Sequence, residues 1–205
     1  MKRLHDNLVF ASSNPGKIRE VSQILADLHL SILPQSEFQV PDADETGLSF
    51  VENALIKARN AASYTGFPAI ADDSGLVVDA LDGAPGIWSA RYAGVGASDE
   101  ANLQKVLREV QALPSRERSA RFVCVLVYLL HPHDPTPIIC QGVWEGELVL
   151  DPRGEFGFGY DPIFFVPTHN CTSAQLLPEV KNALSHRGQA LRALLAALQA
   201  KRLAD

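Results

Sequence analysis

The sequence predicts an α/β fold with a mixed sheet and flanking helices, and three observations carry this prediction. Short apolar runs that suit buried strands alternate with segments whose apolar residues recur every three or four positions, as on one face of a helix. The 205 residues are 46% hydrophobic and 20% charged, which is ordinary for one large globular domain. Glycine and proline number 14 and 13 without a period, which excludes a collagen-like or low-complexity chain.

The first third of the chain reads as two strand–helix pairs. Leu8–Ser12 is a short apolar run typical of a buried strand, and Lys17–Leu28 carries an apolar stripe at helical spacing. Ser31–Leu33 is a candidate second strand. Thr46 has a side chain that caps helices, so we expect a second helix from there to about Thr65.

The middle of the chain contains a polar interruption. Phe67–Ala71 and Leu76–Leu81 are predicted strands, and Asp72-Asp73-Ser74-Gly75 lies between them. The stretch Asp82–Gly96 is rich in glycine and proline and is expected to be a loop. Ser98 then caps a helix whose first turn carries acidic residues, where the helix dipole favours them.

The last part returns to long strands and ends in a helix. Arg121–Leu130 and Ile138–Leu150 are strand-like, and we expect Gly142 and Gly146 to break the second of them. Arg187–Arg202 has leucines at helical spacing and is the predicted terminal helix. There are no internal repeats and no linker typical of a domain boundary, so we expect one domain over residues 1–205.

Charge and cysteine content narrow the function. The net charge is −6 and the pI is near 5.5, which gives no basic footprint for nucleic acid or an anionic membrane. The three cysteines suggest neither a disulfide framework nor a CxxC site, and Cys124 and Cys140 are expected to be buried thiols. No apolar stretch reaches a membrane span of about 18 residues, and Met1–Asn7 lacks a signal-peptide core, so we expect a cytoplasmic protein.

The first candidate site lies between the first strand and the first helix. Its hydroxyl, proline and glycine residues would let backbone N–H groups at a helix N-terminus face a phosphate, and a lysine adds a charge. The alternative is an ordinary capped helix with a solvated lysine. The segment is not a Walker A loop, because Ala11 and Ile18 stand where that motif needs Gly and Ser or Thr. The candidate residues are Ser12, Ser13, Asn14, Pro15, Gly16 and Lys17.

The second candidate is the pair Asp72 and Asp73. In an extended strand adjacent side chains point to opposite faces, so one carboxylate alone, or both through a turn, can reach one metal. Carboxylate oxygens suit Mg²⁺, and two adjacent negative charges after an apolar strand are costly without a cation. The alternative is an Asp-rich turn. Asp42, Asp44 and Glu45 form a second acidic cluster that could add a ligand or be a solvated turn.

The third candidate is Gly154–Pro162, where glycines alternate with aromatic residues. Flat rings on a flexible backbone can stack on a base, although a bulged strand with core aromatics has the same pattern. Lys181 and Ser185-His186-Arg187 lie at the entry to the terminal helix and could form an anion or base-edge site.

In order, these segments resemble the inosine triphosphate pyrophosphatase family, in particular its bacterial members that act on dITP and XTP. The resemblance runs from about Leu8 to Leu198 through SSNPGKIREV, ETGLSFVENALIKAR, AIADDSGLVVDALDGAPGIWSARYAG, GFGYDPIF and SHRGQAL. It implies an elongated two-lobed fold around a long mixed sheet, with the active cleft between the lobes, and a homodimer. It also implies Mg²⁺-dependent hydrolysis of ITP, dITP and XTP to monophosphate and pyrophosphate, which keeps these nucleotides out of DNA and RNA.

The resemblance also implies residue roles. Asp73 would be the general base and would bind Mg²⁺ together with Glu45, and Ser12–Lys17 would hold the triphosphate. His186 and Arg187 are candidate donors to the purine 6-keto oxygen, which would disfavour adenine. The remaining expected substrate contacts are Ser74, Phe158, Gly159, Tyr160, Asp161 and Lys181.

Three rival interpretations compete with this one. A Maf-type pyrophosphatase shares the chemistry, but the SHRGQAL and ADDSGL segments argue against it. A nucleotide sensor without turnover has little use for a base beside a metal. A two-carboxylate glycosidase needs no Gly-Lys phosphate loop near its acids.

Overall fold

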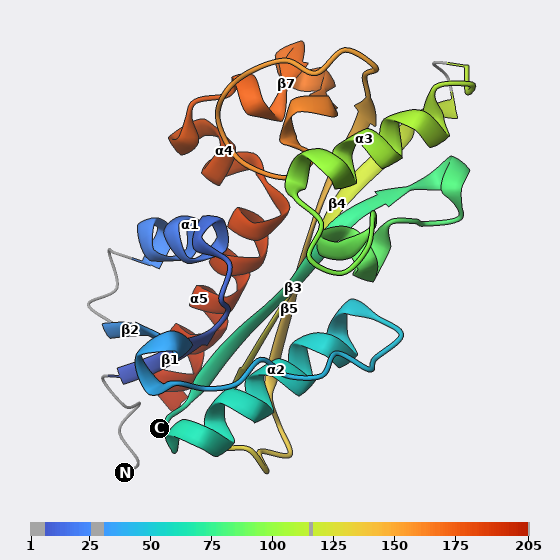
Figure 1. Ribbon diagram of the computed structural model, residues 1–205. Coiled ribbons are helices and arrows are strands. Elements are labelled where there is room, and N and C mark those ends of the chain that lie inside the picture. Colours follow the sequence, from blue (N-terminus) through green and yellow to red (C-terminus); the bar gives the residue numbers. More distant parts are fainter. Residues whose placement is uncertain (1–6, 26–30, 115–116, 205) are drawn as a thin grey trace. The chain divides into compact units, whose positions relative to one another are not determined.

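The computed structural model describes residues 7–25, 31–114 and 117–204, and the fold divides into two compact units (Figure 1). Unit 1 is built from Met1–Asp73, Cys124–Gly142 and Arg187–Asp205, and unit 2 from Ser74–Val123 and Val143–His186. Each unit has its own cluster of buried apolar side chains. The expectation of one domain with two lobes stays a prediction.

The described strands form a seven-stranded mixed sheet in the order β2-β1-β3-β4-β5-β6-β7, which confirms the predicted α/β class. β1 pairs in parallel with β2 and β3, whereas β6 pairs antiparallel with β5 and β7. The strands are β1 (Asn7–Ala11), β2 (Ser31–Pro34), β3 (Ala69–Val78), β4 (Ser119–Leu129), β5 (Ile138–Leu148), β6 (Phe164–Val166) and β7 (Cys171–Thr172).

The helices agree with the predicted ones except at some ends. Ser98 caps α3 as expected, accepting a hydrogen bond from the backbone N–H of Ala101, and the predicted end of the first helix at Leu28 lies outside the described residues. The short helix α4 was not predicted. None of the described helices is long and apolar enough to cross a membrane. The helices are α1 (Pro15–Leu25), α2 (Phe50–Thr65), α3 (Asp99–Val110), α4 (Pro178–Leu184) and α5 (His186–Ala204).

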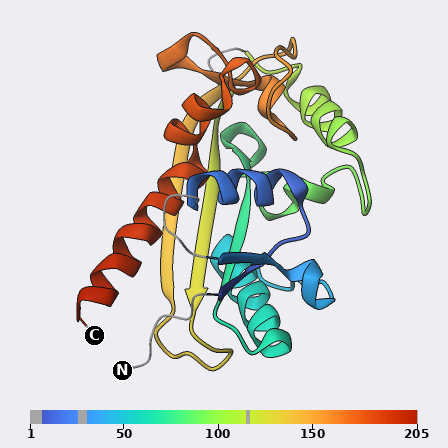
Figure 2. The ribbon, with the colours of Figure 1, turned by 90° about the vertical axis from the view of Figure 1, so that its left-hand side faces the viewer.

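In unit 1 helices cover both faces of the strands (Figures 1 and 2). On one face, α1 and α5 contribute Val21 and Leu191 to an apolar cluster with Phe10 and Ile70. The other face carries α2, whose buried residues are mainly alanines and therefore let the helix approach β1 closely. Because side chains alternate along a strand, Ile70 and Asp72 share the α1 and α5 face, and Asp73 points toward the α2 face.

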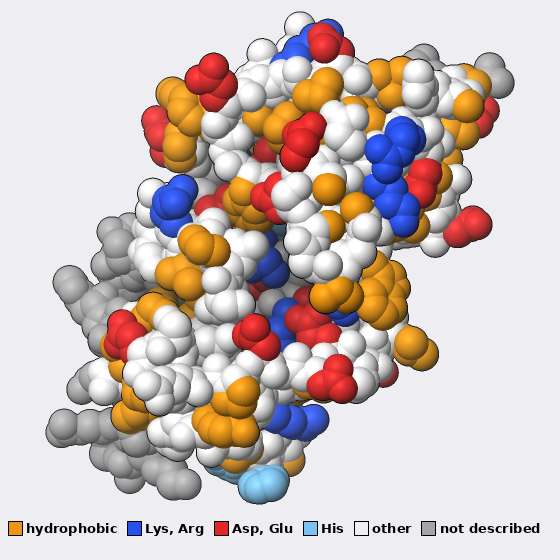
Figure 3. Space-filling model, in the orientation of Figure 1, with side chains coloured by type: hydrophobic (Ala, Val, Ile, Leu, Met, Phe, Trp, Pro, Cys, Tyr) orange, Lys and Arg blue, Asp and Glu red, His pale blue; other side chains and the backbone are white. Residues whose placement is uncertain are grey.

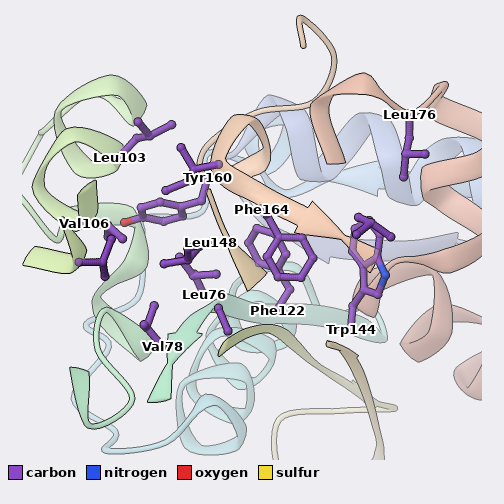
Figure 4. Close-up of a cluster of buried hydrophobic side chains, with 14 residues drawn as sticks. Leu76, Val78, Leu103, Val106, Phe122, Trp144, Leu148, Tyr160, Phe164 and Leu176 are labelled. Carbon is purple, nitrogen blue, oxygen red and sulfur yellow. The ribbon is translucent and has the colours of Figure 1, made fainter. Parts of the chain in front are cut away.

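Unit 2 has an aromatic core, drawn in Figure 4. The Phe122 and Phe164 rings lie 4.5 Å apart between centroids, and the Trp144 ring lies 5.2 Å from Phe164. Tyr160 belongs to the same cluster and is almost fully buried. The core of unit 2 therefore fixes the backbone of the segment that was predicted to bind a base.

The Asp72–Gly75 segment corrects the prediction of two strands separated by a polar turn. β3 runs without interruption from Ala69 to Val78. Gly75 is needed inside the strand because a Cβ there would meet the carbonyl oxygen of Gly86 and the hydroxyl of Ser89. That Ser89 hydroxyl also accepts a 3.0 Å hydrogen bond from the backbone N–H of Leu76. Residues that favour turns adopt an extended conformation here because neighbouring side chains form ion pairs with the two aspartates and a hydrogen bond with the strand backbone.

Four smaller expectations also change. The N-cap of α2 is Ser49 rather than Thr46, since the Ser49 hydroxyl accepts from the backbone N–H of Glu52. β5 continues through Gly142 and Gly146 to Leu148, so these glycines do not break it. The loop Asp82–Gly96 contains a 3₁₀ turn over Gly86–Arg91. Cys124 is buried as expected, whereas Cys140 is half-buried.

Candidate functional site

The turn after β1 is built as a helix N-terminus. The Asn14 side chain accepts a 3.1 Å hydrogen bond from the backbone N–H of Lys17, and the backbone N–H of Asn14 donates to the Ser12 hydroxyl. α1 begins at Pro15, two residues before the expected start at Lys17, and at this first helical position the missing N–H of proline costs nothing. The Lys17 ammonium is not simply solvated, because it pairs with Asp72.

Asp72 is the anchor of one face of unit 1. Its carboxylate is buried between Lys17 of α1 and Arg187 of α5, and Arg187 Nε donates to Asp72 Oδ2 over 3.0 Å. Arg187 also pairs with Glu20 of α1, and the Cys124 thiol donates to Asp72 Oδ2 over 3.1 Å. The doublet's first aspartate therefore ties two helices to β3.

These contacts set the charge states around Asp72. Burial alone would raise the pKa of Asp72, but Lys17 and Arg187 outweigh it and hold the pKa well below its ordinary value of 3.8. Burial and the neighbouring Asp72 charge raise the pKa of Cys124 well above its usual value. Asp72 is thus a permanent anion near neutral pH, and Cys124 stays a neutral thiol.

Asp73 points to the other face and meets a different cation. Lys57 of α2 contacts Asp73 Oδ1 at 2.6 Å and Glu45 Oε1 at 3.0 Å. The structure therefore brings together the two predicted metal ligands, Glu45 and Asp73, around one ammonium group. Asp72 joins neither contact, which confirms that an extended strand sends the two aspartates to opposite faces.

The pKa of Asp73 is shifted in the opposite direction from that of Asp72. Burial raises the pKa of Asp73 above its ordinary 3.8, with a smaller contribution from Glu45, while Lys57 and Lys17 only partly offset this effect. Burial lowers the pKa of Lys57, but Asp73, Glu45 and Asp72 together raise it above 10.5. Asp73 is therefore the carboxylate of the pair that more readily takes up a proton.

Two features of this carboxylate pair fit a hard cation. Among the described residues, Asp73 Oδ2 is buried and has no hydrogen-bond partner. A buried carboxylate oxygen without a donor is a costly arrangement that a bound cation would relieve. Oxygen ligands from two carboxylates, completed by water and phosphate oxygens, are what Mg²⁺ prefers. The residues present therefore suit such an ion.

Lys57 contacts both carboxylates of the candidate site but is not among the residues that the sequence analysis singles out. Its signal was present, because it is a lysine on a helix face otherwise occupied by the buried Asn53, Ala54, Ala58 and Ala61. A charged residue among small buried ones needs a charged partner, and Glu45 and Asp73 are the partners.

In unit 2 the predicted base-binding segment is organised by Asp161. Its buried carboxylate accepts from Lys181 Nζ at 2.6 Å, from the Ser173 hydroxyl at 2.9 Å and from the backbone N–H of Phe158 at 2.8 Å. Lys181 Nζ also lies 5.2 Å from the centroid of the Phe158 ring. Asp161 thus fixes the Lys181 ammonium group and the backbone of Phe158.

The neighbours of Asp161 divide between surface and core. The half-buried Gly159 donates its N–H to Asp99 Oδ2, at 2.9 Å. Tyr160 is a core residue whose hydroxyl donates to the Ser89 carbonyl, and burial raises the pKa of that hydroxyl. The alternative of core aromatics in this segment is therefore correct for Tyr160, whereas the Phe158 ring is only half-buried.

Two further predicted residues, His186 and Ser74, are chain neighbours of Arg187 and Asp73. The His186 ring is buried and stacks on Phe122, with centroids 4.8 Å apart and planes 13° from parallel. Ser74 follows Asp73 in β3 and is half-buried. On the face of the molecule in Figure 3, basic and acidic side chains are interspersed among polar and hydrophobic ones.

The fold and these groups define a class: an α/β protein with a lysine-bearing turn after its first strand and buried carboxylates paired to lysines on both faces of a neighbouring strand. The chain belongs to the Ham1 family, whose model matches residues 8–197. This membership agrees with the resemblance to inosine triphosphate pyrophosphatases.

Comparisons with individual proteins point the same way. A dITP/XTP pyrophosphatase of Pectobacterium atrosepticum is 60% identical over 192 residues, covering 94% of this chain and 98% of that protein. One of Vibrio parahaemolyticus is 58% identical over 194 residues, covering 95% and 97%. The solved structure of a HAM1 protein from Coxiella burnetii superposes with a TM-score of 0.87 at 54% identity, covering 94% of this chain and 98% of that one.

Proposed function

We propose that this chain is a nucleoside-triphosphate pyrophosphatase that hydrolyses dITP, XTP and ITP to the monophosphate and pyrophosphate. The observation that carries the proposal is the convergence of Glu45 and Asp73 on Lys57, beside a lysine-bearing turn. The names of relatives 58% and 60% identical over nearly the whole chain support the same substrates. Removing these nucleotides would keep them out of DNA and RNA, and we propose that the protein does this in the cytoplasm.

We assign the metal role to Glu45 and Asp73, and Mg²⁺ is the ion that their oxygen chemistry favours. When bound, Mg²⁺ neutralises charge on the phosphate oxygens. Lys57 holds both carboxylates in place without it. Asp73 Oδ2 has no hydrogen-bond partner among the described residues, so it could bind a metal ion without breaking a hydrogen bond seen there.

The chain's own residues supply the rest of the chemistry. Water attacks the α-phosphorus, its proton passes to the Asp73 carboxylate, and pyrophosphate leaves. Burial raises the pKa of Asp73 and so makes it a better proton acceptor than an exposed aspartate. The first turn of α1 and Lys17, which Asp72 holds in position, face the anionic phosphates.

We assign nucleoside binding to Phe158, with Lys181 fixed beside its ring by Asp161. The Arg187 guanidinium already serves Asp72 and Glu20, so base recognition would fall to His186 and to first-turn backbone N–H groups of α5. Donors at the 6-keto oxygen would reject adenine, whose amino group would face them unpaired. We also propose that the protein acts as a homodimer.

Pyrophosphate release from dITP, XTP, ITP, GTP and ATP, with and without Mg²⁺, tests the proposal. We expect fast, Mg²⁺-dependent release from the first three nucleotides and far slower release from GTP and ATP. Release of single phosphate, equal rates on all five nucleotides, or activity independent of added metal in chelator-treated protein would each contradict it.

A further inference from the structure

The segment that carries Glu45 lies along a polar stripe of α2. The stripe consists of Asn53, Lys57 and Asn60, which are spaced four and three residues apart and therefore lie on one side of the helix. Each of them binds a different point of residues 41–47. The segment is thus held at three places by one helix.

The three contacts occur in order along the helix. Asn60 Nδ2 donates to the carbonyl oxygen of Pro41 at 2.8 Å, and Lys57 pairs with Glu45 at 3.0 Å. Asn53 Oδ1 accepts from the backbone N–H of Gly47 at 2.9 Å. Glu45 therefore lies between two backbone anchors, and the Asn53 anchor is only two residues away from it.

The Asn53 anchor is the tight one. Asn53 is fully buried, and a Cβ at Gly47 would lie 2.7 Å from Asn53 Oδ1 and 2.5 Å from the Glu52 Cβ. Asn60, in contrast, is only half-buried. Only a glycine can bring the backbone this close to the helix, so the Gly47–Asn53 contact fixes the end of the segment.

The second polar atom of the Asn53 side chain, its amide nitrogen, is also buried. Within the part of the chain that the structure describes, Asn53 Nδ2 is buried and has no hydrogen-bond partner. A leucine or alanine at this position would avoid the cost of burying an unpaired amide nitrogen. Among the described residues, the hydrogen bond of the Asn53 side chain is the one that its Oδ1 accepts from the Gly47 N–H.

We propose that Asn53 is a positioning residue that fixes Gly47 and thereby presents the Glu45 carboxylate beside Asp73 for metal binding. The inference rests on the proposed function, because it concerns the metal site of that reaction. Asn53 acts through the backbone and needs no contact with substrate. Outer partners that orient a metal ligand typically contribute 10–100-fold in metal affinity.

The experiment measures Mn²⁺ binding to the substrate-free full-length protein by electron paramagnetic resonance, with Mn²⁺ as a paramagnetic substitute for Mg²⁺. We expect Asn53→Ala to weaken Mn²⁺ binding about 10-fold. It should also raise the Mg²⁺ concentration for half-maximal pyrophosphate release by a similar factor. At saturating Mg²⁺, the KM for dITP should stay within about twofold, as expected for a defect confined to metal affinity.

Two further variants make the test specific. Gly47→Ala disturbs the same anchor from the segment side and should weaken Mn²⁺ binding similarly, which keeps the test open if Asn53→Ala does not fold. Asn60→Ala removes the more distant anchor on the same helix and should bind Mn²⁺ like the wild type.

The outcomes separate the inference from the proposed function. Wild-type Mn²⁺ affinity in both Asn53→Ala and Gly47→Ala would overturn the inference alone, as would an equal loss in Asn60→Ala. A wild-type protein that neither binds Mn²⁺ nor releases pyrophosphate from dITP would overturn the proposed function, and the inference with it.

Discussion

Asp72 and Asp73 are chemically identical neighbours with different surroundings. Asp72 faces α1 and α5, where it forms ion pairs with Lys17 and Arg187. Asp73 faces α2, shares Lys57 with Glu45, and keeps an oxygen atom without a partner among the described residues. Asp72 is therefore held in ion pairs within unit 1, while Asp73 is the carboxylate that we propose as metal ligand and base. This division leads to different expectations for the two asparagine variants.

Asp72→Asn should destabilise the protein by about 3–5 kcal/mol, because it leaves buried cations without their counter-charge. The effect should depend on pH. The pKa of Asp72 is lowered well below 3.8 in the folded state, so its stabilisation is fully present above that ordinary value, begins to decrease as pH falls below it, and is lost only as pH falls through the lower folded pKa. Urea unfolding between pH 7 and pH 3 should show the difference between the two proteins start to shrink at the acid end. A constant difference across this range would contradict the ion-pair role.

Asp73→Asn should leave the fold intact and lower turnover on dITP by about 10²–10⁴-fold, the range for a lost general base. Its free energy of unfolding without metal should change by less than about 1 kcal/mol, since burial already disfavours the Asp73 charge. Single-turnover kinetics beside urea unfolding would measure both. Full turnover in the folded variant would show that Asp73 is not the base.

Among the secondary-structure elements, α2 shows how an N-cap is selected: Ser49 caps this helix, and Thr46, three residues earlier, does not. The Ser49 hydroxyl accepts from Glu52 N–H, and the Glu52 carboxylate accepts from Ser49 and from Leu48 N–H. Thr46 was the expected cap but lies beyond the Gly47 anchor, where the chain already runs along the helix. The position of a cap therefore depended on a tertiary contact that the helical spacing alone does not show.

Ser49→Ala should lower the free energy of unfolding by about 1 kcal/mol, the usual cost of losing an N-cap. Thr46→Ala, its matched control, should change it by less than about 0.5 kcal/mol because Thr46 is exposed. Thermal or urea unfolding measures both variants. A larger loss in Thr46→Ala than in Ser49→Ala would restore the original expectation.

Much of the fold and part of the site could be predicted from the sequence. Periodicity placed most of the long elements, and the alternation of a strand separated Asp72 from Asp73. Prediction from sequence patterns failed where a residue distant in the chain determines the local conformation. Asp72–Gly75 looks like a turn unless Lys17, Lys57 and Arg187 are known to compensate its charges. Lys57 was missed for the same reason, since its partners are 12 and 16 residues away.

At the scale of the whole molecule, the chain has two cores that share continuous strands. β3, β4 and β5 each begin in one unit and end in the other. Both tryptophans, Trp88 and Trp144, belong to unit 2, so their fluorescence reports that unit alone. We expect the shared strands to couple the unfolding of the two cores.

Leu194→Ala, in the core of unit 1, should lower stability by about 2–5 kcal/mol. The urea midpoint seen by tryptophan fluorescence should fall together with the midpoint seen by far-UV circular dichroism. Leu177→Ala is the matched control, because Leu177 is 53% exposed and should leave both midpoints unchanged. An unchanged fluorescence midpoint in Leu194→Ala would mean that the units unfold independently.

The aspartate doublet also protects β3 against mispairing. A slip of one residue in either direction exchanges the two faces of a strand. In one direction Ala71 would replace Asp72 opposite Arg187, leaving a buried guanidinium beside a methyl group. In the other, Ser74 would replace Asp73 opposite Lys57, and Ile70 would leave its apolar cluster. The charges that the proposed chemistry needs thus also favour the native alignment of β3, in which Arg187 and Lys57 each keep both of their carboxylate partners.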